Sequence, residues 1–455
     1  MKKSEKTTKI LRGMVLVFPA VLYFSYYPVI ALGFSESMNF ELSLPLIYLV
    51  FFDVILLVAL VREKMFVRMF DKWQFLVLPI FVTASVFWSS NLVRGMLTAA
   101  TMWAVYFAIM GMVVLREKIM YKGFSRKFLK WFFGASLLAC VWCFLQCLLD
   151  ILGVSRDCTL LCQGCVSQMF GFPHPNGFAV EPQFMGNLLL APTVVGMVLI
   201  ATKTTSLWRY ALTFVLMATV FLTFSRGAIY AMVVAAVFLT IYYIVRTKKW
   251  HVMVLWPVMM VAFLFTLNLQ GVMAELGPTN DNYMSGAAKV LNHLSLGVAD
   301  LKVEKPSDSP ADGGNEAVFD GYVEESTNVR MGLTNSALKV WRKDFTTMMF
   351  GVGIGGAGEA MYAAGETGSP KEIVQNEYAS LLLEIGAVGV IIVVVTMLMV
   401  LKIALKLDNA GMILTLLVAY SVTLFFFSGL PNAIHIYLMP VMLGLVKIDY
   451  KITKK

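Results

Sequence analysis

Charged residues are scarce in this chain, at 14% of its 455 residues, whereas hydrophobic residues make up 59%. The mean hydropathy is correspondingly high, at +0.75. A water-soluble fold of this length cannot hide that much apolar surface. The shortage of charge therefore excludes a soluble globular protein and predicts an integral membrane protein that is covered by lipid.

Cysteine and histidine are also rare, with 6 and 4 residues. One group of cysteines shares a helical face of an apolar run and is expected to pack in it. These are Cys140, Cys143 and Cys147. Cys158, Cys162 and Cys165 lie in an external loop, where an oxidising compartment would allow one disulfide and leave an odd thiol. With only His174 nearby, their spacing matches no common zinc finger, so no metal or cofactor is predicted.

A net charge of +9 does not indicate nucleic-acid binding, because the basic residues lie between apolar runs rather than on one solvated face. Most of these runs approach the ~20 residues that a spanning helix needs. Their approximate bounds are 10–32, 43–61, 73–89, 95–115, 128–152, 183–201, 207–224, 228–245, 251–269, 379–401, 411–428 and 431–446. The first resembles a signal peptide, but it spans a full bilayer and lacks a cleavage site, so we expect a retained helix. The predicted fold is all-α, with about twelve transmembrane helices.

Lysine and arginine are concentrated in alternate connections between the runs. These residues are Arg62, Lys64, Arg68, Lys72, Arg116, Lys118, Lys122, Arg126, Lys127, Lys130, Arg246, Lys248, Lys249, Lys402, Lys406, Lys451, Lys454 and Lys455. Because short cytoplasmic loops hold positive charge, these connections and both termini are predicted to be cytoplasmic.

Two external segments stand out, 153–180 and 270–378. The second is long for a structureless connection, so a mostly helical cap is expected there. In it, apolar residues recur at helical spacing over 328–341, which places Arg330 on or beside a helix. The predicted domains are 1–269 with helices one to nine, the cap at 270–378, and 379–455 with the last three helices.

The cap contains a G-x-G-x-x-G pattern at 353–358. A dinucleotide loop would need a preceding strand in a cytosolic βαβ unit, and this pattern lies in neither setting. We interpret it as a tight turn that lets the backbone approach the membrane or a substrate.

Polar residues at the ends of apolar runs are the candidate functional residues, because buried charge in a bilayer is costly. Arg226 follows a helix that turns at the outer face, where it either snorkels to lipid phosphates or holds a phosphate or diphosphate. Glu181 either caps the sixth run or acts as a general base. Glu384 lies deeper, below Gln375, Asn376 and Glu377, and is expected to need a partner such as an arginine from the cap.

Four motifs, taken in order, resemble the O-antigen ligase and O-antigen polymerase family of bacterial envelope glycosyltransferases. They are S-R-G-A at 225–228, R-M-G-L-T-N-S-A-L-K-V-W at 330–341, F-G-V-G-I-G at 350–355 and Q-N-E-Y-A-S-L-L-L-E-I-G at 375–386. The resemblance implies a metal-independent, inverting enzyme of the bacterial cytoplasmic membrane. Such an enzyme takes a glycan from undecaprenyl diphosphate and passes it to an acceptor hydroxyl on the extracytoplasmic side.

By this resemblance, Arg226 and Arg330 would bind the diphosphate, and Glu181 is our preferred residue for the acceptor hydroxyl. The predicted substrate-binding residues are His174, Asn176, Trp341, Gln375, Asn376 and Glu377. Family members often have His-Asn where this chain has Gln375-Asn376, and glutamine cannot take a proton at neutral pH.

The predicted function is polymerisation of lipid-linked repeat units, with transfer of finished glycan by a ligase as the alternative. The expected partners are the lipid-linked glycan and membrane lipids, with a chain-length regulator left open and no nucleic acid. A transporter or flippase is the alternative from another class. Its support is Asp53 inside an apolar run, but no repeated half accompanies it.

Overall fold

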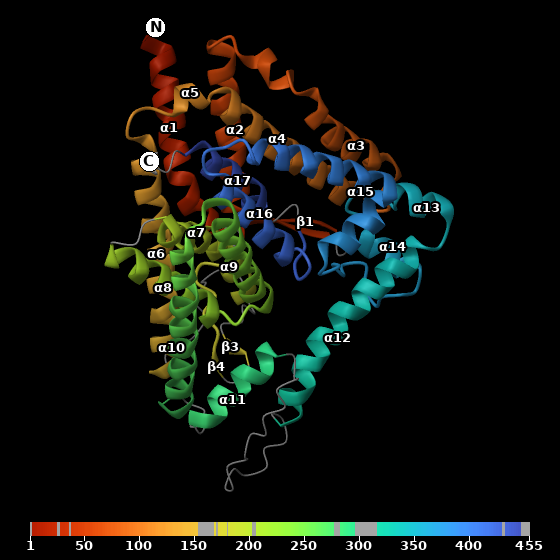
Figure 1. Cartoon of the computed structure of the whole chain (residues 1–455). Coiled ribbons are helices and arrows are strands. Elements are labelled where there is room, and N and C mark those ends of the chain that lie inside the picture. The colour runs from red at the N-terminus through yellow and green to blue at the C-terminus, as the bar shows by residue number, and fades with distance from the viewer. Residues whose placement is uncertain are drawn as a thin grey trace. The chain divides into compact units, whose positions relative to one another are not determined.

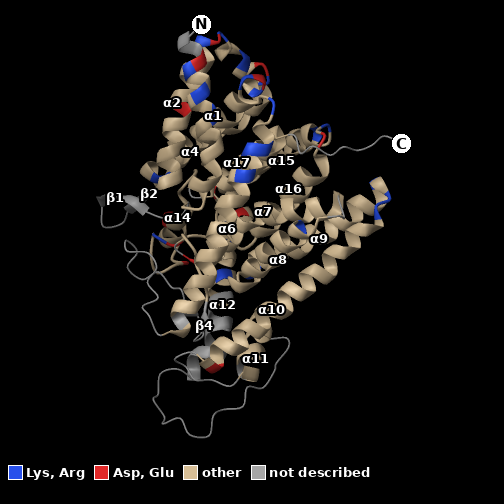
Figure 2. Cartoon of the chain, turned by 90° about the vertical axis from the view of Figure 1, so that its left-hand side faces the viewer, with Lys and Arg blue, Asp and Glu red and all other residues tan. Residues whose placement is uncertain are grey.

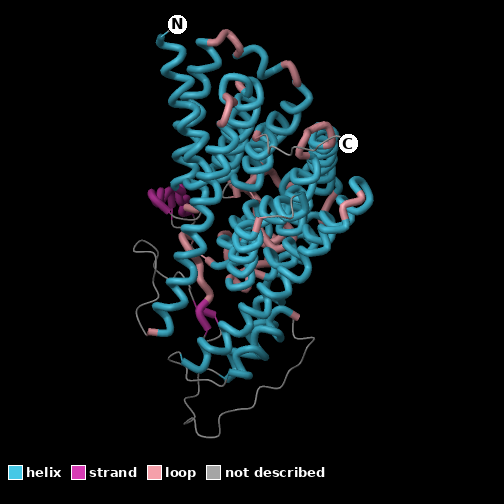
Figure 3. The backbone as a smooth tube through the Cα atoms, turned by 60° about the vertical axis from the view of Figure 1, so that its left-hand side comes forward, coloured by secondary structure: helices cyan, strands magenta, loops and turns pink. Residues whose placement is uncertain are grey.

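Helices dominate the computed structural model of the chain, and the strands among its described residues form two short hairpins (Figure 1, Figure 3). The structure describes residues 2–24, 28–35, 38–152, 168–169, 172–179, 181–202, 206–276, 283–295, 316–429 and 433–446. For these residues the predicted all-α fold is confirmed apart from the two hairpins. The predicted disulfide cysteines, Cys158, Cys162 and Cys165, lie outside them.

Among the described residues, 7 helices are long and apolar enough to cross a membrane. They are α2 (Leu44–Arg62), α4 (Leu92–Val114), α6 (Phe124–Ile151), α7 (Pro182–Thr202), α9 (Arg226–Thr247), α10 (Leu255–Leu276) with the η4 turn (Trp250–Val254) before it, and α15 (Glu377–Ala404). Shorter apolar segments are α8 (Leu207–Leu222), α16 (Ala410–Thr423), α17 (Ile434–Leu445), and α3 (Val77–Ser85) with its flanking turns η2 (Trp73–Leu76) and η3 (Val86–Trp88). Each predicted run contains at least part of a helix.

The predicted end of the first helix is wrong. Helix α1 (Lys2–Leu22) ends well before residue 32, and Pro28 begins strand β1 (Pro28–Ser35). Proline lacks a backbone N–H and disfavours helical geometry in the residue before it, so an apolar run that contains one need not stay helical. Strand β1 pairs antiparallel with β2 (Met38–Ser43), which leads directly into α2.

The chain divides into two compact units. Unit 1 comprises 1–132 and 330–455, and unit 2 comprises 133–329. Besides the elements already named, unit 1 holds η1 (Phe66–Phe70), α5 (Arg116–Ile119), α13 (Phe345–Phe350) and α14 (Ala357–Ala363), and unit 2 holds β3 (Gln168–Met169), β4 (Phe172–Pro173) and α11 (Tyr283–Leu294). Helices α6 and α12 (Glu316–Trp341) contribute to both.

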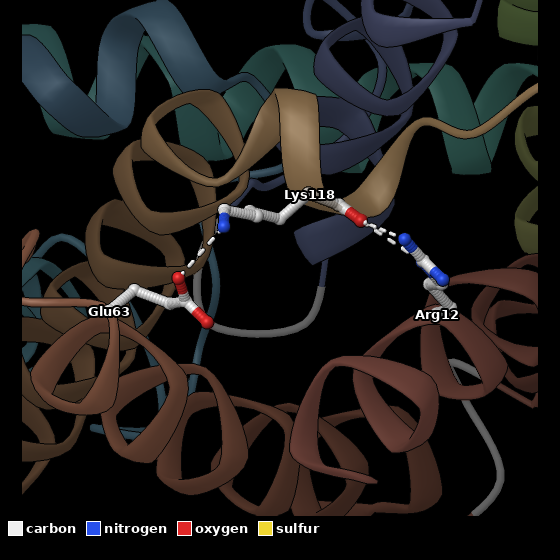
Figure 4. Close-up of polar contacts among 3 residues, drawn as sticks. All are labelled: Arg12, Glu63 and Lys118. Atoms are coloured by element: carbon white, nitrogen blue, oxygen red, sulfur yellow. Dashed lines mark hydrogen bonds and ion pairs between the residues drawn. The ribbon is translucent and has the colours of Figure 1, made fainter. Parts of the chain in front are cut away.

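One end of unit 1 is charged, and its polar contacts join α1, α2 and α5 (Figure 2, Figure 4). Arg12 donates two hydrogen bonds to the carbonyl of Lys118, at 3.0 and 2.7 Å, and the ammonium of Lys118 lies 2.9 Å from the carboxylate of Glu63. These contacts gather the basic start of α1 with the loops after α2 and α4. All three segments are predicted to be cytoplasmic.

The core of unit 2 is α7, in which 94% of the most apolar 18-residue stretch is buried. It packs against α8, α9 and η4 through small side chains. Gly186 lies so close to α9 that a Cβ there would come within 2.8 Å of Ala228. On α6, Cys140, Cys143 and Cys147 are buried free thiols, which confirms their prediction as packing residues.

Candidate functional site

The predicted site residues divide between the two units. His174, Asn176, Glu181 and Arg226 belong to unit 2, and the remaining ones belong to unit 1. Each group has its own local structure.

Arg226 occupies the first turn of α9, directly after the short reversal from α8. Ser225 is the N-cap, and its hydroxyl accepts a hydrogen bond from the N–H of Ala228. Phe224 has a left-handed backbone, with φ +47°, which costs a residue with a side chain about 1–2 kcal/mol. Arg226 itself is only 8% exposed. We call residues 223–227 the Arg226 turn; its buried arginine is held by a reversal that is strained at Phe224.

Two buried histidines contact the Arg226 turn. His174 donates to the backbone carbonyl of Thr223, and the Nε2 atom of His293, on α11, lies 3.1 Å from the carbonyl oxygen of Phe224. The ring of His174 also lies 4.9 Å from the ring of Phe224. Burial, with the nearby His293 adding to it, lowers the pKa of His174 to about 3. His174 is therefore neutral at physiological pH.

Asn176 is held inside unit 2 rather than at its surface. Its side-chain oxygen accepts a hydrogen bond of 2.8 Å from the side-chain amide of Gln146 on α6. The side-chain oxygen Oε1 of Gln146 accepts one of 2.9 Å from the backbone N–H of Gly177. Asn176 is 1% exposed. The buried amide pair fixes the loop that also carries His174.

Glu181 has an exposed side chain at the start of α7, where its carbonyl accepts hydrogen bonds from Phe184 and Met185. One turn further along α7, Gly186 packs against the side chain of Ser225. Glu181 and the Arg226 turn therefore lie at the same end of unit 2.

In unit 1, Arg330 is half-buried on α12, so the helix predicted over 328–341 is confirmed. Trp341 donates from its indole to the carbonyl of Met348 at 3.0 Å and packs against a core that includes Ala337 and Leu383. This contact fastens the end of α12 to α13, and α13 in turn packs along α15 (Figure 1).

The Q-N-E-Y motif surrounds the start of α15. Asn376 is the N-cap, and its side chain accepts from the N–H groups of Tyr378 and Ala379. Gln375 is exposed. Glu377 is only 6% exposed, and its carboxylate accepts a hydrogen bond of 2.6 Å from the N–H of Gly429. Asn376 and Glu377 thus fix the helix start, and Gln375 and Tyr378 are the exposed members of the motif.

The glycine loop, residues 351–358, is a tight turn, as predicted. Gly353 and Gly355 have φ +88° and +76°, and a Cβ on Gly353 would lie 2.3 Å from the Cα of Ser89. The loop backbone lies against α15 and the start of α4. Its N–H groups at Gly355 and Ala357 donate to the buried carboxylate of Glu384.

The expected partner of Glu384 is indeed an arginine, but the cap does not supply it. Arg94, in the first turn of α4, interacts with the carboxylate. The sequence interpretation overlooked Arg94, although it is a charged residue at the edge of an apolar run and the same argument that selected Arg226 applies to it. His293 and Gln146 were also missed, because their partners are distant in sequence.

No group of three or more His, Cys, Asp and Glu side chains in the described ranges is arranged to hold a metal ion. Residues 211–394 match the family model described as O-antigen ligase. The match encloses all four motifs, from the S-R-G-A of 225–228 to the segment 375–386. No curated protein matches the chain, and no solved structure does either.

Proposed function

We propose that this chain, whose residues 211–394 match the O-antigen ligase family model, polymerises oligosaccharide repeat units carried on undecaprenyl diphosphate. The proposed location is the outer face of a bacterial cytoplasmic membrane, with about twelve transmembrane helices and both termini inside. The observation that carries the proposal is that the family match encloses two arginines of suitable chemistry, Arg226 at a helix start and Arg330 on α12.

Arg226 is suited to a diphosphate for two reasons. Its planar guanidinium can donate to two phosphate oxygens at once. It also lies at the N-terminus of α9, a helix of 22 residues, where the helix dipole favours negative charge. Arg330 is the second proposed diphosphate ligand. As the bond between the sugar and the diphosphate breaks, the two charges would stabilise the leaving group.

Glu181 is the proposed group for the acceptor. It is exposed at the same end of unit 2 as the Arg226 turn. In the proposed step, the acceptor hydroxyl oxygen attacks the anomeric carbon with inversion and its proton passes to Glu181. The undecaprenyl diphosphate leaves with the bonding electrons. Gln375, which is exposed beside α15, is the proposed contact for the glycan.

Transfer of finished glycan to another acceptor is the second candidate, because the matching family is described as O-antigen ligase. The two reactions share the donor and differ in the acceptor. The size of the lipid-linked glycan in cells therefore distinguishes them.

The test is the length distribution of lipid-linked glycan in cells that lack the gene and are rescued with wild type, Arg226→Ala or Arg330→Ala. We expect single repeat units to accumulate without the gene and with either arginine variant, because losing one charge donor typically slows such a reaction by ~10²-fold or more. Normal polymer that stays on its carrier would instead indicate a ligase.

Each arginine has a matched control on its own helix. Arg246→Ala removes an exposed arginine at the far end of α9, and Lys339→Ala removes an exposed charge of α12 whose partner is Glu366, 3.1 Å away. Both controls should restore polymer at equal protein levels. Glycan that is unchanged in every strain would refute both polymerase and ligase.

A further inference from the structure

The reversal between α8 and α9 presents a problem of hydrogen bonding. The last carbonyls of a helix have no partner within it, and such groups are costly to leave unpaired when buried. Here the next helix begins almost at once, and Thr223, Phe224 and Ser225 are all at most 6% exposed. The carbonyl of Ser225 accepts from the N–H of Ile229 within α9, whereas the carbonyls of Thr223 and Phe224 are bonded by side chains from other segments.

Those side chains are the two histidines. His174 donates to the carbonyl of Thr223 and His293 contacts the carbonyl of Phe224, so consecutive carbonyls of the reversal each have an imidazole partner. The rings lie 6.2 Å apart at an interplanar angle of 84°. They come from separate segments, the loop before α7 and the helix α11. Together they fix two successive peptide planes immediately before the N-cap of α9.

We infer that His174 and His293 are positioning residues that brace the Arg226 turn, rather than groups that touch the substrate or exchange protons with it. The inference rests on the proposed function, in which Arg226 binds the diphosphate. Phe224 holds an unfavourable left-handed conformation, with φ +47°, and would relax if its carbonyl lost its partner. Because Arg226 is two residues further on, that relaxation would move its guanidinium away from the diphosphate.

Because His293 lies on α11, the segment predicted to be the external cap also helps to position the Arg226 turn. Helix α11 follows α10 in the segment predicted to be the cap, and it has two contacts with the region of α9. His293 reaches the Arg226 turn, whereas the hydroxyl of Tyr230 donates to the carbonyl of Leu294 at 2.7 Å. The first contact holds the turn and the second holds only α11. A variant that lacks the His293 contact therefore tests positioning of Arg226, and a variant that lacks the Tyr230 contact tests only the attachment of α11.

The experiment measures binding of undecaprenyl diphosphate to the full-length protein in detergent micelles. His293→Gln keeps an N–H donor near the position of Nε2, whereas His293→Asn has a donor that is too short to reach Phe224. We expect the glutamine variant to bind within about threefold of wild type and the asparagine variant to bind ~10-fold more weakly, since small displacements of a positioned group cost this much or more. Tyr230→Phe is the matched control and should bind like wild type.

A double variant tests whether His293 acts through Arg226. Arg226→Ala should lose diphosphate binding, and adding His293→Asn should cause no further loss, because coupled residues are not additive. Thermal unfolding of every variant accompanies the binding data. Equal destabilisation by His293→Asn and Tyr230→Phe, with weaker binding in the first alone, would support positioning.

Two results overturn the inference and differ from failure of the proposed function. Wild-type affinity in His293→Asn, or equal loss in His293→Gln and His293→Asn, would show that the donor to Phe224 does not position the arginine. If Arg226→Ala binds undecaprenyl diphosphate as well as wild type, the proposed role of Arg226 is wrong. The inference that the two histidines position it for the diphosphate is then wrong as well.

Discussion

The Arg226 turn of unit 2 and the glycine loop of unit 1 are fixed in opposite ways. In the turn, side-chain donors on His174 and His293 serve backbone carbonyls. In the loop, backbone N–H groups of Gly355 and Ala357 serve the carboxylate of Glu384. The difference follows from the backbone, because a helix end presents carbonyls and a left-handed glycine turn presents N–H groups. The turn therefore depends on side chains that reach it, and the loop on glycines that let it close.

The largest effect is expected at a glycine of the loop. Gly353→Ala would place a Cβ 2.3 Å from the Cα of Ser89 at φ +88°, so backbone would have to move and unit 1 should not fold stably. Gly365→Ala is the control, because φ is +73° but nothing lies within 4 Å. It should cost only about 1–2 kcal/mol of stability. The folded fraction after detergent extraction is measured for both variants. Equal fractions would mean that the close approach of Gly353 to Ser89 does not limit the residue at this position.

Removal of the carboxylate comes next. Glu384→Ala leaves Arg94 without its nearby opposite charge and two buried N–H groups without their acceptor, and such a loss typically costs about 3–5 kcal/mol of unfolding free energy. Glu384→Gln, which keeps one acceptor oxygen, should lose less. Glu366→Ala breaks the exposed pair with Lys339 and should cost under about 1 kcal/mol. Thermal unfolding gives the order, and a Glu384→Ala variant as stable as Glu366→Ala would contradict the role of the carboxylate.

Acid should weaken the Arg226 turn through His174. The pKa of this histidine falls from 6.5 to about 3 in the folded protein, so the unfolded chain takes up a proton first as the pH drops. Stability is complete above pH 6.5 and declines as the pH falls toward 3. At pH 5 the loss from this group is about 2 kcal/mol. His174→Gln should reduce the drop in unfolding temperature between pH 7.5 and pH 5. An equal drop in the variant and in wild type would contradict the role of His174 in acid destabilisation.

The smallest effect separates two roles of Asn376. Asn376→Ala removes the N-cap of α15 and should cost about 1 kcal/mol. Asn376→Ser replaces one capping residue with another and should restore stability. If capping is its whole function, the serine variant also restores polymer; if Asn376 binds the glycan, the serine variant is stable but polymer stays short. Ser225→Ala, which removes the cap of α9, gives the corresponding measurement in unit 2.

Much of the fold follows from local patterns in the sequence. Apolar runs near the length of a bilayer predicted the long helices, and helical spacing predicted the end of α12. The three cysteines of α6 are buried, as one shared face implied. The end of α1 could not be predicted from hydropathy alone, because hydropathy does not distinguish the helix from the strand that begins at Pro28.

The candidate site was predicted less completely. Single residues with costly chemistry, such as Arg226 and Glu384, stood out in the sequence. The residues that support the site did not, since Arg94, Gln146 and His293 each interact with a residue far along the chain. His174 and Asn176 were predicted to bind substrate, and their burial and hydrogen bonds now favour support of the turn.

The sequence by itself determined the class of protein, the positions of most helices and the family resemblance that the match at 211–394 supports, because composition, run length and short motifs are local properties. Only the tertiary structure decided what the polar residues contact. Hydrogen bonds such as those from Ser89 to Ile354 and from His293 to Phe224 join segments that meet after the helices have packed. A buried donor or acceptor must find a partner, but nothing local in the sequence specifies which one.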